Sequence, residues 1–151
     1  MNRADKAVAG FKGGLTCSQA VLLSFAEDCG LTNDKTLELT TGCGGGMART
    51  TQTCGAVTGA YLVIGLKFGG TTAEDKATKE NTDQVMRTFN DKFKDRNQSL
   101  ICKELLNCDI STPAGLEEAR QKSLFITRCP KMIRDAVEIL KEISVRSSSQ
   151  K

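Results

Sequence analysis

The sequence predicts an all-α protein that forms a single compact bundle of about five to seven helices. Apolar residues recur at helical spacing along most of the 151 residues, whereas the strict apolar–polar alternation of strands is nearly absent. The chain has only two prolines, Pro113 and Pro130, and no linker interrupts it. Its length suits one domain. We therefore expect one domain over residues 1–146 and a disordered, serine-rich tail over 147–151.

Glycines and capping residues mark the expected helix ends in the first half of the chain. Gly13 ends the first helix, and Thr16 with Gln19 has the spacing of a capping box at the start of the second. A glycine-rich loop over 41–47 separates the third helix from the fourth. The expected helices cover residues 3–12, 17–28 and 33–40, followed by a helix of small residues from near Cys54 to before Gly69.

The second half of the chain is expected to begin with a long polar helix over 73–96, which carries a narrow apolar stripe. Ser99 is expected to cap a short helix that contains Cys102. Pro113 indicates a loop, and Pro130 is expected to separate the last two helices. These last helices are predicted over residues 116–127 and 131–145.

The chain contains seven cysteines and no histidine. The absence of histidine excludes a Ser–His–Asp triad, a mixed Cys/His zinc finger, His-ligated haem and a facial-triad iron site. No C-x-x-C pair occurs, so thioredoxin-type chemistry and zinc ribbons lack their signature. Seven thiols cannot all pair with one another in disulfides. Any soft-metal or redox chemistry in this protein must therefore depend on thiols.

Charge and hydropathy narrow the expected partners and compartment. The net charge is +3, no run of five basic residues occurs, and the chain has no Trp and one Tyr, so we expect no nucleic-acid partner. The most apolar stretch, residues 56–66, is too short for a membrane span, which needs roughly 20 residues. The first residues lack the apolar core of a signal peptide. These observations predict a cytoplasmic protein with reduced thiols.

Four cysteines fall at expected helix N-termini, where unpaired N–H groups and the helix dipole favour a thiolate. In such positions the pKa of a thiol can fall from about 8.5 to between roughly 3.5 and 7.5. The alternative interpretation is that free cysteines are small buried hydrophobic residues. We predict that four thiols serve as redox groups and as ligands of a cofactor or metal: Cys17, Cys54, Cys102 and Cys129.

The remaining three cysteines are expected to have other roles. Cys29 precedes a helix-ending glycine and is predicted to be structural, while Cys108 is a spare thiol or an alternative metal ligand. Cys43 is also an alternative ligand, because it lies in a glycine-rich loop that allows a cofactor, an anion or a helix to approach closely. The residues predicted to line the site beside Cys43 are Gly44, Gly45, Gly46 and Gly55.

These motifs resemble a known protein family. The resemblance rests on CSQAV at residues 17–21, CGAVTG at residues 54–59, and the later Cys102 and Cys129. Together they resemble the redox-active family named for its C…CGAxxG…C…C pattern, over about residues 10–140. The resemblance implies a small, cysteine-dependent redox protein in which these four cysteines are the functional positions. A related group of cytochromes carries a similar domain with an iron–sulphur centre, but haem attachment motifs are absent here.

Three functions remain open on the sequence. The first is electron transfer through an iron–sulphur cluster, or another all-Cys metal centre such as zinc, bound by the four thiolates. The second is thiol–disulfide exchange with a redox partner protein or a small thiol. Cys54 would then attack, and Cys17, Cys102 or Cys129 would resolve. The third is a helical interaction module, with structural zinc or no cofactor, that forms a homodimer through the small face of Gly55 and Gly59.

Overall fold

The computed structural model describes residues 1–149 and confirms the all-α prediction. The chain is 67% helical, with eight helices and no strands among the described residues, which is slightly more helices than expected. The helices are α1 (Arg3–Lys12), α2 (Cys17–Leu23), α3 (Asn33–Thr40), α4 (Gly55–Phe68), α5 (Lys76–Asn97), α6 (Cys102–Leu106), α7 (Pro113–Gln121) and α8 (Leu124–Ser149).

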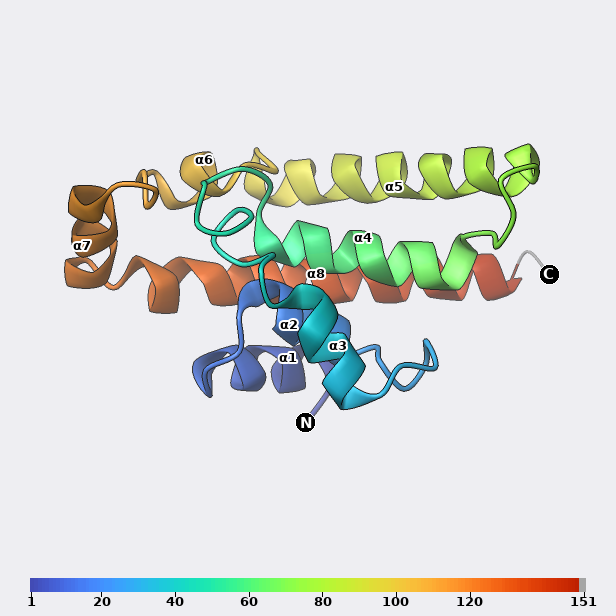
Figure 1. The fold of residues 1–151 in the computed structure, drawn as a ribbon, viewed down its shortest axis with the longest axis horizontal. Coiled ribbons are helices and arrows are strands. Elements are labelled where there is room, and N and C mark those ends of the chain that lie inside the picture. The colour runs from blue at the N-terminus through green and yellow to red at the C-terminus, as the bar shows by residue number, and fades with distance from the viewer. Residues whose placement is uncertain (150–151) are drawn as a thin grey trace.

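Three long helices, α4, α5 and α8, run alongside one another and form the body of the molecule (Figure 1). Helices α1 and α2 pack against this body on one side, α1 on α8 and α2 mainly on α4, with α3 beside α2. Helices α6 and α7 lie at the end of the body where α8 begins (Figure 1). The chain thus builds a three-helix body with a smaller group of helices at one end.

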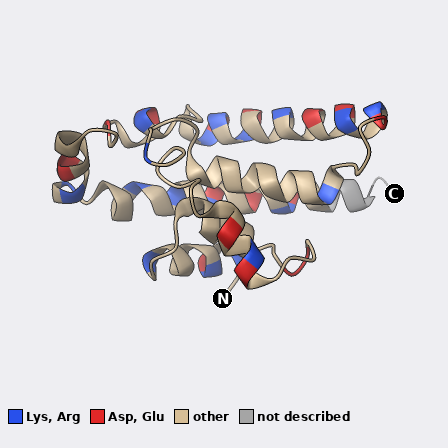
Figure 2. Cartoon of the chain, in the orientation of Figure 1, with Lys and Arg blue, Asp and Glu red and all other residues tan. Residues whose placement is uncertain are grey.

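Helices α4 and α5 differ in composition because they occupy different positions. Figure 2 shows charged side chains along α5, whereas α4 is almost uncharged because neighbouring helices cover it. A Cβ on Gly59 of α4 would lie 2.9 Å from the Ser18 carbonyl oxygen of α2, so only glycine fits there. On α5, Phe89 and Phe93 are fully buried, and Arg96 forms ion pairs with carboxylates of α8. The face of α4 that carries the small residues is therefore packed against α2 inside the fold.

The buried apolar side chains form two clusters. The larger one joins α1, α2, α4, α5, α8 and, through Leu105, α6. The smaller one joins α6, α7 and the start of α8, and it includes three cysteines, Cys102, Cys108 and Cys129. Cys17 packs against both clusters. The thiols therefore gather where the two clusters meet.

Several helix boundaries differ from the predictions. Helix α2 ends at Leu23, and residues 24–30 form turns instead of continuing the helix to 28. Helix α5 begins at Lys76 instead of 73. Helix α7 begins at Pro113, which was expected to lie in a loop, and ends at Gln121 instead of 127. Thr112 caps it by accepting a hydrogen bond from the Gly115 amide, and proline suits the first helical position, where no N–H is needed. Ser99 does not directly precede α6, because Ile101 is its N-cap residue.

Helix α8 runs unbroken through Pro130, so the predicted break between the last two helices is wrong. Proline removes one helical hydrogen bond, to the carbonyl of Ile126, but packing on both sides of Pro130 retains the helix. The helix reaches Ser149, while Gln150 and Lys151 of the predicted disordered tail lie outside the described residues.

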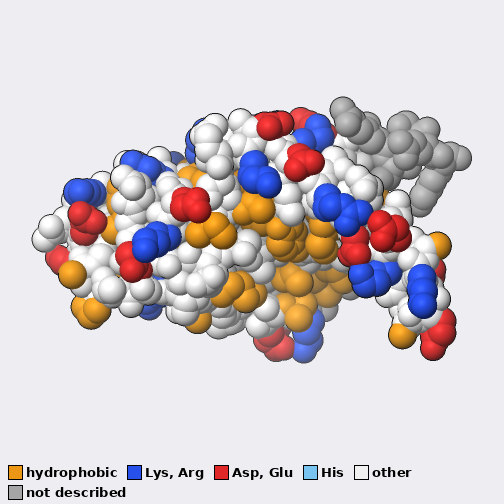
Figure 3. All heavy atoms as spheres, turned by 90° about the horizontal axis from the view of Figure 1, so that it is seen from above, with side chains coloured by type: hydrophobic (Ala, Val, Ile, Leu, Met, Phe, Trp, Pro, Cys, Tyr) orange, Lys and Arg blue, Asp and Glu red, His pale blue; other side chains and the backbone are white. Residues whose placement is uncertain are grey.

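The surface mixes charges of both signs. On the face seen in Figure 3, basic and acidic side chains are interspersed, with hydrophobic side chains visible between them. Within residues 1–149, none of the helices combines the length and apolarity that crossing a bilayer requires.

Candidate functional site

The four predicted functional cysteines line one cavity of about 530 Å³. The cavity lies between the loop that joins α3 to α4 (residues 41–53, the glycine loop), the starts of α2, α4 and α6, and the first half of α8. Residues far apart in the sequence thus meet in one place. We call this space the thiol cavity; its cysteines are Cys17, Cys54, Cys102 and Cys129.

A short backbone pairing places two of these thiols together. Thr53 and Ile101 form an isolated antiparallel bridge between the glycine loop and the residue before α6. On either side of it, the amides of Cys54 and Cys102 donate hydrogen bonds of 2.8 and 2.7 Å to carbonyls of the opposite segment. The bridge therefore fixes Cys54 and Cys102, each at the N-terminal end of its helix, relative to one another.

Helix α2 positions the third thiol. Thr16 accepts a hydrogen bond from the Gln19 amide, and the Gln19 side chain accepts one from the Thr16 amide, which confirms the predicted capping box. Cys17 is therefore the first residue of α2, as expected. A Cβ on Gly55 would lie 3.0 Å from the Cys17 Cβ, so this glycine lets α4 approach the thiol closely.

The fourth thiol has a different setting from the one predicted. Cys129 was expected to be the N-cap of the last helix, but it lies inside α8, one turn after the helix starts at Leu124. The expectation was wrong because α8 continues through Pro130. Cys129 still faces the thiol cavity, since the start of α8 forms one of its walls.

Burial reverses the expected effect of the helix N-termini on thiol acidity. The Ala56 and Val57 amides beside Cys54 act to lower its pKa, but burial acts more strongly and raises the pKa to about 11. Burial also raises the pKa of Cys102 to about 12, with Cys54 and Cys129 adding to the shift. The prediction of lowered pKa values is therefore wrong for these two thiols, which are neutral at pH 7.

Cys17 and Cys129 shift each other's pKa in opposite directions. Their side-chain interaction lowers the pKa of Cys129 and, together with burial, raises the pKa of Cys17 well above its usual value. Cys54 and Cys102 raise the pKa of Cys17 further because their negative charges would oppose a third one. Cys129 is therefore the thiol in the cavity that is favoured as a thiolate.

The glycine loop has an unusual backbone. Residues 45–49 all have positive φ values, between 55° and 73°, and Thr51 has a φ of 60°. Only two of these six residues are glycines, and a left-handed conformation costs other residues roughly 1–2 kcal/mol each. The amides of residues 44–47 have no hydrogen-bond acceptor among the described residues. The loop thus holds strained backbone, with four successive free N–H groups, beside the thiols.

The thiol cavity is walled chiefly by apolar side chains and carries positive charge. Its apolar walls come mainly from α6, α7 and α8. Two arginines line it, Arg49 of the glycine loop and Arg120 of α7, and no Asp or Glu does. Sequence reasoning missed both arginines because only the fold brings Arg49 and Arg120 together at the four cysteines. The sequence offered one signal for Arg49: it closely follows three consecutive glycines, in the loop that was expected to border the site.

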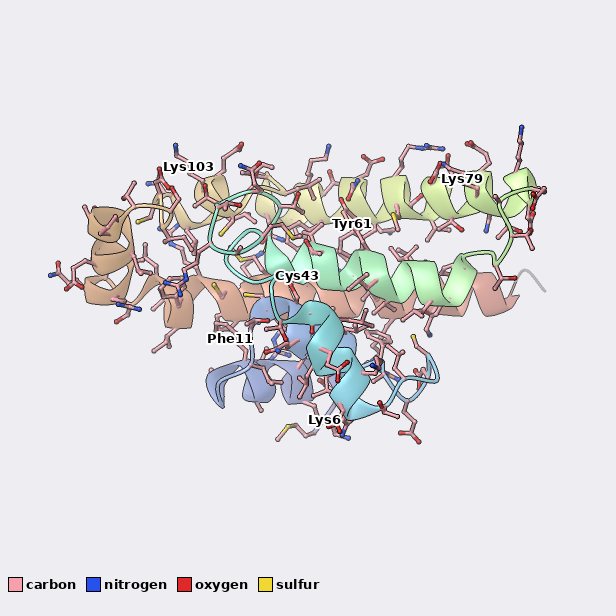
Figure 4. All side chains as sticks on the ribbon, in the orientation of Figure 1. Lys6, Phe11, Cys43, Tyr61, Lys79 and Lys103 are labelled. Atoms are coloured by element: carbon pink, nitrogen blue, oxygen red, sulfur yellow. The ribbon has the colours of Figure 1, made fainter. Side chains whose placement is uncertain are left out.

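The other predicted site residues divide into two groups. Gly44, Gly45 and Gly55 line the thiol cavity, whereas Gly46 does not. None of the three remaining cysteines lines it either. Cys43 lies in the glycine loop just after α3 (Figure 4), and its thiol donates to the Leu39 carbonyl over 3.9 Å. Cys108 donates to Glu118, and Cys29 is a half-buried thiol whose pKa burial raises.

The donor set suits a soft metal centre, although no such centre is preformed. All seven cysteines are free, and the cavity offers four thiols with no competing carboxylate. In the described part of the chain, no three cysteine, aspartate or glutamate side chains are grouped closely enough to hold a metal ion. Binding would therefore require the thiols to lose protons and change rotamer.

Residues 15–143 match the model of the family described as "Putative redox-active protein (C_GCAxxG_C_C)". That range includes all seven cysteines. The family's pattern reads Gly-Cys-Ala, whereas this chain has Cys54 before Gly55. A side chain at position 55 would lie against Cys17 and Ser18. Searches of curated proteins and of solved structures found no match. On the family match, which spans most of its length, the chain belongs to this redox-active C_GCAxxG_C_C family.

Proposed function

We propose that the thiol cavity binds an iron–sulphur cluster through Cys17, Cys54, Cys102 and Cys129 and that the protein transfers electrons. The observation that carries this proposal is the convergence of four thiols, from four separate segments, on one cavity without carboxylates. Four cysteine thiolates are the usual ligand set of such clusters, and a cluster supplies one-electron redox chemistry when bound. Membership of a redox-active family supports the same function.

The residues around the thiols would favour an anionic centre. The Ala56 and Val57 amides lie beside Cys54 at the start of α4 and act to lower its pKa; hydrogen bonds from such amides to a thiolate stabilise its charge and tune the reduction potential. The apolar walls of α6, α7 and α8 limit water around the sulphurs. The free amides of residues 44–47 form a row of donors of the kind that binds anionic centres.

The test is anaerobic purification followed by an absorption spectrum and assays of iron and acid-labile sulphide. We expect brown protein that contains both iron and sulphide. Cys54→Ser is expected to lose most of the iron, while Cys29→Ser, the matched control outside the cavity, retains it. Colourless, metal-free wild-type protein, or equal iron retention in both variants, would contradict the proposal. Zinc in place of iron would show a structural metal centre instead.

The second candidate, thiol–disulfide exchange, is favoured by Cys17 and Cys129, which line the same cavity and shift each other's pKa. In this candidate the two thiols are oxidised to one disulfide with loss of two electrons and two protons. A substrate disulfide would accept both and leave as two thiols. The sequence favoured Cys54 as the attacking thiol, but Cys129 suits that role better because its interaction with Cys17 lowers its pKa. Mass spectrometry of oxidised, metal-free protein should find a Cys17–Cys129 disulfide; a different pairing would refute this candidate.

The interaction-module alternative receives no comparable support. It required thiols scattered through the core and an exposed glycine face on α4. Instead, four thiols line one cavity, and Gly55 and Gly59 are buried against α2. That face is therefore not available for a dimer contact.

A further inference from the structure

The two arginines of the thiol cavity differ from most other arginines of the protein. Arg49 and Arg120 line the cavity, and neither forms an ion pair within the described residues. Four other arginines each pair with a carboxylate: Arg3, Arg87, Arg96 and Arg134. No acidic side chain lines the cavity. The thiol cavity thus has two arginine side chains that form no ion pair with the described residues and could pair with a bound anion.

Apart from the thiols, the loop glycines, Thr16 and Thr41, the rest of the cavity wall is apolar. Its volume of about 530 Å³ lies within the range of roughly 300–1,000 Å³ that is typical of small-molecule sites. Sites of this kind combine apolar walls with a few polar groups that fix the orientation of the ligand. Here the apolar contacts come from Leu105, Leu106, Ile110, Leu116 and Phe125.

The glycine loop adds hydrogen-bond donors to the same wall. Gly44 and Gly45 line the cavity, and both belong to the run of four amides without an acceptor. Arg49 lies at the end of the left-handed segment of this loop, so its backbone position is fixed by that segment. Successive free amides and arginine side chains are both suited to carboxylate, sulfonate or phosphate groups.

We propose that the thiol cavity binds a small organic anion, with its acidic group at Arg49 and Arg120 and its apolar body against α6, α7 and α8. This anion would be the substrate or redox partner that the thiols or their cluster act upon, and in that role the inference rests on the proposed function. Its binding, in contrast, depends on the arginines and the apolar wall. Binding can therefore be measured without any redox activity.

The experiment is a fluorescence titration of metal-free, reduced protein with 8-anilinonaphthalene-1-sulfonate, an apolar sulfonate. We expect saturable binding by the native protein, and about a tenfold loss of affinity in Arg49→Gln and in Arg120→Gln, because each removes one charge-assisted hydrogen bond. Arg87→Gln is the matched control, since Arg87 is paired with Glu80 on α5, outside the cavity. Circular dichroism should show that all three variants remain folded.

A competition experiment tests the need for negative charge. Octanoate should displace the probe, whereas 1-octanol, which has the same chain length and no charge, should do so much more weakly. Absence of probe binding, unchanged affinity in both cavity variants, or equal displacement by octanol would overturn the proposal. Failure of the redox function looks different: the protein would bind the probe through Arg49 and Arg120 but contain no iron and form no Cys17–Cys129 disulfide.

Discussion

The two ends of helix α8 lie in contrasting surroundings. Towards its C-terminal part, Ile133, Val137 and Leu140 are almost fully buried in the larger apolar cluster, which joins six helices. Nearer its start, Cys129 and Met132 border a cavity of about 530 Å³. One continuous helix thus contributes side chains to the packed core and to the wall of the thiol cavity.

The contrast shows how the fold separates stability from chemistry. In the packed end, the rings of Phe89 and Phe93 stack with centroids 5.8 Å apart, and both side chains are fully buried. In the hollow end, four small thiols and four glycines stand where larger apolar residues would close the space. The packed end should therefore govern the free energy of unfolding, and the hollow end should govern ligand binding.

The largest expected effect is a difference in stability between alanine variants of two phenylalanines, one at each end of the molecule. Phe93→Ala removes a fully buried ring from the packed end and should lower the free energy of unfolding by about 3–5 kcal/mol. Phe125→Ala removes a half-buried ring from the cavity wall and should cost about 1 kcal/mol, while weakening binding of the sulfonate probe. Urea denaturation measures the loss of stability in both variants. Equal losses of stability would show that the cavity end is as important to folding as the packed end.

A smaller effect should appear at alkaline pH in metal-free protein. The pKa of Cys54 is 9.0 when unperturbed and about 11 in the folded protein, so the folded state retains a proton that the unfolded chain releases. This contribution to stability is present below about pH 9 and is lost as the pH rises through about 11. Its size is roughly 2–3 kcal/mol. Urea denaturation from pH 7 to 11 should show a flatter pH dependence in Cys54→Ala; profiles of the same slope would contradict the shift.

The smallest expected effect is a difference in stability between alanine variants of two glycines of α4. Gly59→Ala places a Cβ 2.9 Å from the Ser18 carbonyl oxygen and should cost about 1–2 kcal/mol by overpacking. Gly65→Ala has open space and should stabilise the helix by about 0.5–1 kcal/mol, because alanine favours the helical conformation. Thermal unfolding should move the midpoint in opposite directions. A loss of stability in both variants would mean that α4 is tightly packed along its whole length.

Much of the fold can be predicted because its signals are local. The helices at 3–12 and 33–40 have the predicted bounds, since capping residues lie next to each helix start in the sequence. The continuation of α8 through Pro130 could not be predicted, because packing by distant residues offsets the lost hydrogen bond.

The candidate site is predictable in its members but not in its electrostatics. Placement at helix N-termini singled out Cys17, Cys54 and Cys102, and these thiols do lie there. The sign of the pKa shift of Cys54 was wrong because it depends on burial by several segments at once. Arg49 and Arg120 enter the site through the path of the backbone; for Arg120 the sequence has no local signal, and for Arg49 only the nearby glycines.

The convergence of the thiols also has a consequence for the order of folding. They come from positions 17, 54, 102 and 129, so the cavity is complete only after α8 has packed against the earlier helices. A cofactor or a disulfide that joins thiols from these separate segments can therefore form only after the segments have come together. Because burial keeps Cys54 and Cys102 protonated in the folded protein, these two thiols are poorly reactive towards oxidants there. The burial that holds them neutral thereby protects the folded, empty site from oxidation.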